Sequence, residues 1–299
     1  MARRRDPAKM LAAFGRLVRP REALEPILAK AVRGALTEWL TEIWAEDELK
    51  AVNLTARKRA LFSGPPGVGK TTLAHHLAAR LGLSMLSVRP DRLIDSYIGS
   101  TGQNIGTLFD LASARKPPVL LFLDELDAIG FQRKDATQSA GDEQNGWINT
   151  LLQRIEAHDG YLIAATNRAR AIDEALWRRF ERQIELQLPG PHERRRIVQR
   201  YLAPYELPAS ALELLSAALA EASPALIRTF CEGLKRHLII GPKVGWPMVK
   251  EAVFERVLAA MQPHPDLPTP PLWSKGFERK RLLLAFPWPL ELKREGAAA

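Results

Sequence analysis

The chain of 299 residues has a single cysteine, Cys231, and no apolar run that approaches the length of a membrane span. One cysteine excludes an intrachain disulfide and fits a reducing compartment, so we expect a cytoplasmic protein that has no membrane partner. The Arg-rich start, residues 1–10, lacks the apolar stretch of a secretory signal and fits a solvated basic arm better than a transit peptide. The six histidines show no metal-ligand spacing.

Acidic residues are in the minority: 34 Asp and Glu stand against 43 Lys and Arg, which gives a net charge of +9. Such a charge favours acidic partners, nucleic acid among them. It fits equally well with simple solubility or with a phosphate-bearing ligand, which needs basic neighbours. The charge balance alone therefore does not select a function.

Helix and strand patterns alternate along the first two thirds of the sequence. Residues 22–50 carry an apolar stripe with a 3.6-residue period, which predicts helix. From Arg57 onward, short apolar runs alternate with helical stretches, a pattern typical of βαβ units and a parallel sheet. The runs lack polar alternation, as expected for strands that are covered on both faces. The five expected strands are residues 60–62, 84–88, 119–123, 161–165 and 184–188.

The pattern changes after the fifth strand. Four helical stretches separated by Pro and Gly predict a small all-helical domain; they are residues 192–203, 208–221, 224–239 and 247–261. The Pro-rich segment that follows has little pattern and is expected to lie extended on a surface of this protein or of a partner. We divide the chain into an N-terminal basic arm and helical segment (1–52), a large αβα domain (53–190), a helical domain (191–262) and a C-terminal tail (263–299).

A glycine-rich turn joins the first of the five expected strands to the next helix. It reads Gly64-Pro65-Pro66-Gly67-Val68-Gly69-Lys70-Thr71 and matches the phosphate-loop template G-x-x-x-x-G-K-[ST]. Glycines let backbone N–H groups turn towards a β-phosphate, and the start of the helix adds a favourable dipole. We expect Lys70 to reach the β- and γ-phosphates of ATP and Thr71 to bind Mg²⁺. Thr72 completes the expected nucleotide contacts.

Two carboxylates follow the buried run Val119–Leu123. Because that run is expected to be a central strand, Asp124 and Glu125 should lie at the carboxyl edge of the sheet, where open α/β folds bind ligands. Asp124 is suited to hold Mg²⁺, and Glu125 is suited to polarise the attacking water. We expect the nearby Asp127 to act as a charge at a helix start.

Asn167 ends the fourth expected strand in the sequence Ala165-Thr166-Asn167. An Asn at this place can bind both the γ-phosphate and the attacking water. In isolation such a residue is usually part of a turn. Its assignment as a γ-phosphate sensor therefore depends on the two preceding motifs.

Together these segments resemble the AAA family of ATPases, within the wider AAA+ class. The residues that carry the resemblance are the phosphate loop, the run Leu121-Phe122-Leu123-Asp124-Glu125-Leu126-Asp127-Ala128-Ile129, and the stretch from Ala165-Thr166-Asn167-Arg168 to Phe180. The resemblance covers roughly residues 55–240. It implies a P-loop NTPase fold, an αβα sandwich with a five-stranded parallel sheet in the order 5-1-4-3-2, followed by a small helical lid.

The resemblance also implies a homo-hexameric ring, in which one subunit completes the ATP site of the next with an arginine finger. Arg178 and Arg179 stand where the family places these fingers, and we favour Arg179; Arg182 is a weaker candidate. A cation brought to the γ-phosphate is worth on the order of 10³–10⁵ in rate in related phosphotransfer enzymes.

The loop after the second strand resembles the family's first pore loop. Its triplet Tyr97-Ile98-Gly99 would face the central channel and grip an extended polypeptide. A Tyr-Ile pair in a loop is otherwise ordinary packing. The position in the family pattern favours the pore assignment.

The sequence departs from the family pattern in three places. Arginines are absent near Gln144-Asn145-Gly146, no clear sensor-2 arginine precedes the lid helix, and the chain has no H-E-x-x-H protease motif. Arg228 is expected to be an exposed helical arginine rather than a replacement for sensor 2.

Three functions remain open at this point. The first is a motor that threads or rearranges a polypeptide, with a separate partner such as a protease. The second is a nucleic-acid-associated ATPase of a mobile element or defence system, motivated by the charge and by Arg194-Arg195-Arg196. The third is an assembly protein that binds ATP but seldom hydrolyses it; Glu125, Asn167 and Arg179 argue against this one.

Overall fold

The computed structural model describes residues 10–94, 100–129, 138–290 and 292, although it leaves out the side chains of residues 138–145. The chain divides into two compact units. The first unit comprises Met1–Pro26, Lys30–Gly64 and Gly69–Leu186, and the second comprises Ile27–Ala29, Pro65–Val68 and Gln187–Ala299.

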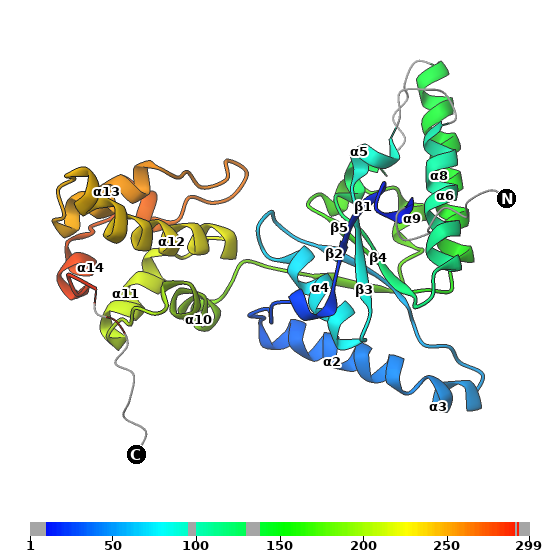
Figure 1. The fold of residues 1–299 in the computed structure, drawn as a ribbon, viewed down its shortest axis with the longest axis horizontal. Helices are drawn as coiled ribbons and strands as arrows, with labels where there is room; N and C mark the ends of the chain where they lie inside the picture. The colour runs from blue at the N-terminus through cyan, green and yellow to red at the C-terminus, as the bar shows by residue number, and fades with distance from the viewer. Residues whose placement is uncertain (1–9, 95–99, 130–137, 291, 293–299) are drawn as a thin grey trace. The chain divides into compact units, whose positions relative to one another are not determined.

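A six-stranded sheet forms the centre of the first unit (Figure 1). The strands are β1 (Gly15–Val18), β2 (Arg59–Ser63), β3 (Ser84–Val88), β4 (Val119–Leu123), β5 (Leu162–Thr166) and β6 (Arg182–Glu185). They lie in the order β1-β3-β4-β5-β2-β6, and β2 to β6 are parallel. The five strands predicted from the sequence are therefore confirmed, as is their order 5-1-4-3-2.

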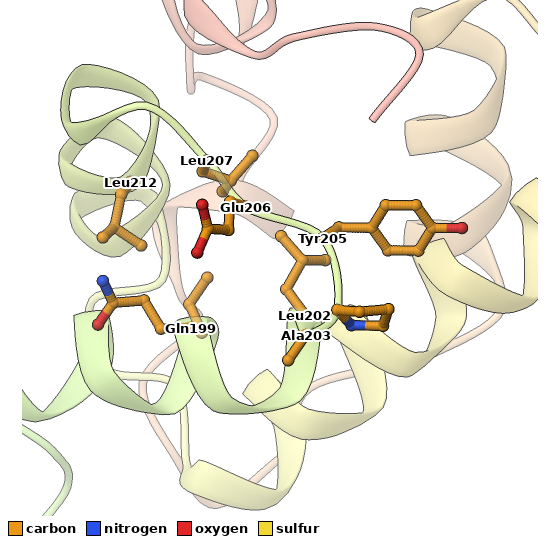
Figure 2. Close-up of a pocket in the computed structure, with 9 residues that line it drawn as sticks. Gln199, Leu202, Ala203, Tyr205, Glu206, Leu207 and Leu212 are labelled. Carbon is orange, nitrogen blue, oxygen red and sulfur yellow. The ribbon is translucent and has the colours of Figure 1, made fainter. Parts of the chain in front are cut away.

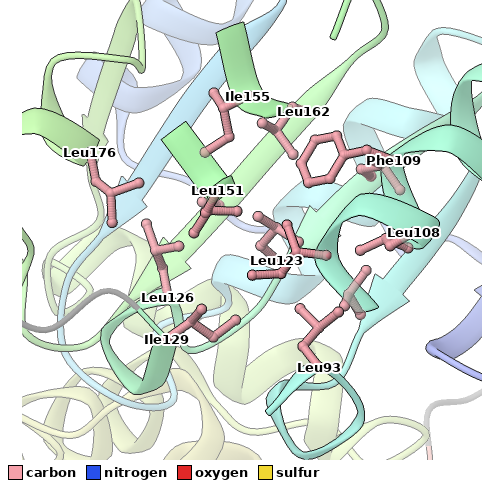
Figure 3. Close-up of a cluster of buried hydrophobic side chains, with 14 of the residues drawn as sticks. Leu93, Leu108, Phe109, Leu123, Leu126, Ile129, Leu151, Ile155, Leu162 and Leu176 are labelled. Atoms are coloured by element: carbon pink, nitrogen blue, oxygen red, sulfur yellow. The ribbon is translucent and has the colours of Figure 1, made fainter. Parts of the chain in front are cut away.

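Helices cover both faces of this sheet. Every residue of β4 is buried, because alternate side chains enter opposite helical layers. Val119, Leu121 and Leu123 join the core that Figure 3 shows. That core is closed by α5 (Pro90–Leu93), α6 (Ser100–Ala114), α7 (Leu126–Ile129), α8 (Gln138–Ala157) and α9 (Glu174–Trp177), with η2 (Ala169–Ala171) between β5 and α9. On the other face lie α4 (Lys70–Arg80) and α2 (Lys30–Trp44), and α3 (Glu46–Ala51) follows α2.

The edge strand β1 was not predicted. It pairs antiparallel with β3, from Gly15 opposite Val88 to Val18 opposite Met85. A side chain at Gly15 would place its Cβ 2.0 Å from the carbonyl oxygen of Ser87, so the close pairing requires glycine here.

The helix expected over residues 22–50 is shorter than predicted. The turn η1 (Pro20–Glu22) is followed by a non-helical stretch that runs to Ala29. Within residues 22–50, only α2 and α3 are α-helical. Pro26 lies inside the predicted helix and disfavours it there, since a proline has no N–H group to donate within a helix.

An ion-pair network attaches α2 to the sheet. Glu42 accepts hydrogen bonds from the Nε and backbone N–H of Arg57, at 2.7 and 2.9 Å, and from Arg182 at 3.1 Å. Arg182 also donates to Glu38 at 2.5 Å. The hydrogen bonds from Arg57 lower the pKa of Glu42 to about 2.

Replacing Glu42 by Gln should lower the free energy of unfolding at pH 7 by about 1–3 kcal/mol, because it removes charge-assisted hydrogen bonds. The folded pKa of Glu42 lies below its ordinary value of 4.5, so the contribution to stability is present above pH 4.5 and disappears as the pH falls towards 2. Urea denaturation at several pH values measures this change. The exposed Glu48→Gln serves as control, and an equal loss at pH 7 and at pH 2.5 would contradict the assignment.

The second unit is helical. It contains α10 (Pro191–Leu202), α11 (Ala209–Ala218), α12 (Pro224–Ile240), α13 (Lys250–Ala259) and α14 (Lys280–Ala285), with the short turns η3 (Gly241–Val244) and η4 (Pro271–Trp273). The four predicted helices agree with α10 to α13. Cys231 is fully buried in α12, and burial raises its thiol pKa to about 12, which fits core packing rather than a nucleophile.

Much of the Pro-rich segment after Pro263 belongs to the core of this unit. Leu272, Leu282, Phe286 and Leu290 are buried, and the ring of Phe286 lies 5.0 Å from that of Phe254 in an edge-to-face contact. The indole of Trp288 donates to the carbonyl of Met248 at 2.7 Å, and Lys250 donates to the carbonyl of Phe286 at 2.7 Å.

A pocket of about 460 Å³ lies between the end of α10 and the start of α11 (Figure 2). Its lining is largely apolar, with Leu202, Leu207 and Leu212 beside Gln199 and Glu206. These side chains contain no pair of catalytic groups, so we assign no chemistry to this pocket.

Two neighbouring side chains allow a test of the packing of the Pro-rich segment. Phe286 is 1% exposed, and Leu284 is 77% exposed. Phe286→Ala should destabilise the second unit by about 3–5 kcal/mol, because it leaves a cavity. Leu284→Ala should change stability by less than about 0.5 kcal/mol. Thermal denaturation followed by circular dichroism compares them, and similar melting temperatures for the two variants would show that the segment is not part of the core.

Candidate active site

The site lies at the carboxyl edge of the sheet in the first unit. Strands β2, β5 and β4 are neighbours, and each ends next to a residue that the sequence motifs selected. Lys70 begins α4 after the loop that follows β2, Asn167 follows β5, and Asp124 follows β4. Three segments that are far apart in the sequence therefore converge on one place.

The phosphate loop contains three glycines in backbone conformations that other residues rarely adopt. The φ angles are 139° at Gly64, 76° at Gly67 and 99° at Gly69. At Gly64 a Cβ would also lie 2.0 Å from the carbonyl oxygen of Leu186. The intervening residues, Pro65 to Val68, group with the second unit.

Lys70 is the central cation of the site. Its side chain is buried, and its Nζ donates to the carbonyl of Gly64 and to Oδ1 of Asn167, both at 2.7 Å. Burial lowers the pKa of Lys70, while the carboxylates of Asp124 and Asp127 act in the opposite direction. A buried ammonium held at the phosphate loop is suited to exchange these oxygens for phosphate oxygens.

Thr71 and Asp124, the two residues that the sequence suggests for Mg²⁺, are in direct contact. The hydroxyl of Thr71 donates to Oδ2 of Asp124 at 2.9 Å, so the two groups meet in space. A hydroxyl and a carboxylate are oxygen donors of the kind that Mg²⁺ binds in nucleotide sites, so these residues fit the ion. Thr72 is exposed beside them at the start of α4.

Glu125 is exposed and has a left-handed backbone, with φ of 50°. Its own N–H donates to Oδ1 of Asp124 at 3.0 Å. This arrangement places the two carboxylates on one tight turn, with that of Glu125 in solvent where a water can reach it.

Asp127 has a role that the sequence did not reveal. It lies in the first turn of α7, as expected, but its Oδ1 also accepts a hydrogen bond from the hydroxyl of Thr166 at 2.8 Å. The same hydroxyl oxygen accepts from the N–H of Arg168 at 2.9 Å. Asp127 thus fixes the residues on both sides of Asn167.

The candidate arginine fingers both have a carboxylate partner within the chain. Arg178 forms an ion pair with Glu174, one turn earlier. The Nε of Arg179 lies 2.6 Å from Oε1 of Glu156 on α8. The two groups form an ion pair, but their geometry is not that of a hydrogen bond.

Two other arginines have structural partners. Arg182, the weaker finger candidate, is 17% exposed and belongs to the ion-pair network of α2. Arg228 pairs with Glu232 at 2.8 Å and lies over the ring of Tyr201, as a surface helical arginine does. The expected pore triplet, Tyr97, Ile98 and Gly99, lies outside the described residues.

The comparisons with known proteins agree with this geometry. The model of the ATPase family associated with various cellular activities (AAA) matches residues 60–188. These residues form an ATP-binding AAA domain, and this family of domains hydrolyses ATP.

Several relatives share this part of the chain. An uncharacterized AAA family ATPase, y4kL, of Sinorhizobium fredii is 41% identical over 54% of this chain and 49% of the relative. The 26S proteasome regulatory subunit 6A of Saccharomyces cerevisiae is 38% identical over 51% of this chain and 36% of its own length. The ATP-dependent zinc metalloprotease FtsH of Lancefieldella parvula is 31% identical over 55% and 26%. The chain thus spans half or less of these relatives.

Asp127→Ala should lower the turnover of ATP at least about tenfold and leave its binding nearly unchanged, because Asn167 loses its support while Lys70 and Thr71 stay in place. Steady-state kinetics and a fluorescent ATP analogue separate the two effects. Asp127→Asn keeps the Oδ1 acceptor and should recover most of the turnover; equal losses in both variants would argue against a positioning role.

Proposed function

We propose that the chain is an ATP-hydrolysing subunit of a homo-hexameric ring that threads or rearranges a polypeptide. The observation that carries this proposal is the convergence of Lys70, Thr71, Asp124 and Asn167 at one sheet edge, linked by direct hydrogen bonds. A site built only for binding would not need an exposed carboxylate beside these groups, as Glu125 is.

Each residue has a defined task in the proposed reaction. The backbone of the phosphate loop and Lys70 hold the β- and γ-phosphates of ATP, and Thr71 and Asp124 hold Mg²⁺. When bound, Mg²⁺ neutralises charge on the phosphate oxygens. Glu125 polarises the attacking water, and Asn167 orients that water against the γ-phosphate.

The arginine fingers act on the neighbouring subunit in this proposal. Arg178 and Arg179 each have a carboxylate partner within the subunit, Glu174 and Glu156. The pair of Arg178 with Glu174 is exposed to solvent and is therefore weak, so Arg178 can leave its carboxylate for a γ-phosphate at modest cost. Arg179 is half-buried beside Glu156, so its release costs more. Assembly of the ring would then complete the active site.

The relatives support a polypeptide substrate. One is a regulatory subunit of the proteasome and another is an ATP-dependent protease. We infer from them that this protein acts on proteins and delivers its substrate to a separate partner, such as a protease. The described residues contain no helix that is long and apolar enough to span a membrane.

Nucleic acid is the less favoured partner. Two residues of the arginine run that suggested it have partners within the chain: Arg194 donates to the carbonyls of Ser216 and Pro189, and Arg195 pairs with Glu213. A titration with single-stranded DNA at two salt concentrations tests this, because phosphate contacts weaken steeply with salt. Salt-sensitive, tight binding would favour the nucleic-acid function instead.

Glu125→Gln should reduce ATP turnover by at least about 10²-fold and keep ATP bound, because the water loses its general base while the phosphate contacts remain. Single-turnover kinetics and retention of labelled ATP on gel filtration measure both effects. Lys70→Ala is the matched control, since it should lose binding itself. Wild-type turnover in Glu125→Gln would remove Glu125 from its assigned role.

Tyr97→Ala should preserve ATP hydrolysis but weaken the grip on a polypeptide at least about tenfold, because an aromatic side chain supplies the contact area. The probe is fluorescein-labelled casein. Fluorescence anisotropy follows its ATP-dependent capture by the Glu125→Gln variant and by the same variant that also carries Tyr97→Ala. Tyr97→Phe retains the ring and should behave like the parent. Unchanged capture by Tyr97→Ala would exclude Tyr97 from substrate binding.

A further inference from the structure

The start of helix α12 contacts the phosphate loop through backbone atoms. The N–H of Ala225 donates to the carbonyl oxygen of Gly67 at 3.1 Å. The loop residues Pro65–Val68 and the whole of α12 belong to the second unit, so this contact lies within one unit.

The backbone donors in the first turn of α12 have different partners. The first N–H groups of any helix lack an acceptor within the helix and must find one elsewhere. Pro224 has no N–H, Leu226 donates to the hydroxyl of Ser223 at 3.2 Å, and Ile227 donates to the Ser223 carbonyl at 3.0 Å. The N–H of Ala225, the second helical residue, is the donor in this turn that reaches the phosphate loop.

The side chains of Ser223 and Ala225 also leave no room for a side chain at Gly67. A Cβ at Gly67 would lie 2.9 Å from the Cβ of Ala225 and 3.0 Å from the Oγ of Ser223. Ser223 is buried, and its hydroxyl caps α12, so moving it would cost a cap as well. The loop and the start of the helix therefore fit closely at this point.

The hydrogen bond from Ala225 sets the direction of one peptide group of the loop. The peptide between Gly67 and Val68 is trans, so its C=O and N–H groups point in opposite directions. Because the carbonyl of Gly67 points to Ala225, the N–H of Val68 points away from that contact. Gly67 has a φ of 76° and, as a glycine, little preference for one conformation, so an outside partner is needed to hold this peptide.

We propose that Ala225 is a positioning residue for the nucleotide. Its N–H holds the peptide of Gly67 and Val68 in the orientation in which the N–H of Val68 meets the β-phosphate, as backbone N–H groups of glycine-rich loops do. ATP and ADP share the β-phosphate, so the contact strengthens the binding of both. The inference rests on the nucleotide site of the proposed function and adds to it a residue outside the matched residues 60–188.

The test measures the binding of N-methylanthraniloyl-ADP and of the matching ATP analogue by fluorescence anisotropy, in the Glu125→Gln background so that ATP is not consumed. Ala225→Pro removes the donor, and a proline is tolerated in the first turn of a helix. Ala225→Gly keeps the donor. Ser210→Pro places a proline at the second residue of α11 and is the matched control. Circular dichroism checks that each variant is folded.

Ala225→Pro should weaken the binding of ADP and of ATP by the same factor, about tenfold, because the loop loses the hydrogen bond that orients its peptide. Ala225→Gly and Ser210→Pro should bind both nucleotides within about twofold of the parent. With Glu125 restored, a single turnover of bound ATP should be as fast in Ala225→Pro as in the parent, because Glu125 and Asn167 are unchanged.

Gly67→Ala gives a second test that does not depend on proline. This variant should bind both nucleotides more weakly, because its new Cβ meets that of Ala225. Adding Ala225→Gly removes the opposing Cβ and should restore part of the lost affinity, as expected for two residues in contact. No restoration would show that the start of α12 does not constrain the loop at Gly67.

Several outcomes would overturn the proposal. Parent-like binding by Ala225→Pro would show that the donor is not needed, while the nucleotide site would stand. Weaker binding of ATP alone would place the effect at the γ-phosphate. An equal loss in Ala225→Gly or in Ser210→Pro would assign the effect to the side chain or to general damage of the helical unit. A parent that binds neither nucleotide would refute the proposed site and this contact together.

Discussion

The burial of one ammonium group constrains the arrangement of the whole site. Lys70 is largely removed from solvent, and a buried cation is costly unless oxygen atoms surround it. Two of its acceptors come from segments that are far apart in the sequence, the carbonyl of Gly64 and the amide oxygen of Asn167. The parallel sheet brings these together, because β2 and β5 are adjacent and end at the same edge. The fold thus supplies the oxygen atoms that offset the cost of burying the ammonium group of Lys70.

Most of the fold could be predicted from the sequence, because the hydrophobic pattern of a short segment often reflects how that segment is buried in the structure. Strands such as β4 are buried on both faces and therefore read as continuous apolar runs. The edge strand β1 could not be predicted, because its four residues become a strand only through pairing with β3. The same holds for the segment around Phe286, whose buried residues are too widely spaced to show a period.

The site shows the same division between local and distant information. The phosphate loop and Asp124-Glu125 are contiguous motifs, so their residue types alone indicated the chemistry. Asp127 was missed as a support for Asn167 because its partner Thr166 lies 39 residues further along the chain. The engagement of Arg182 with Glu38 and Glu42 was likewise invisible, since it depends on how α2 packs beside β6.

The backbone conformation of Glu125 lowers the stability of the fold, while its carboxylate is the group proposed for the reaction. A residue with a side chain costs roughly 1–2 kcal/mol in the left-handed conformation that Glu125 adopts, whereas glycine adopts it freely. Glycine at this position would relax the turn and at the same time delete the carboxylate. A search for more stable versions of this protein would therefore select against the carboxylate that we propose as the general base. Stability favours glycine at this position, whereas the proposed reaction requires the carboxylate, so selection for stability alone would remove the group on which the proposed turnover depends.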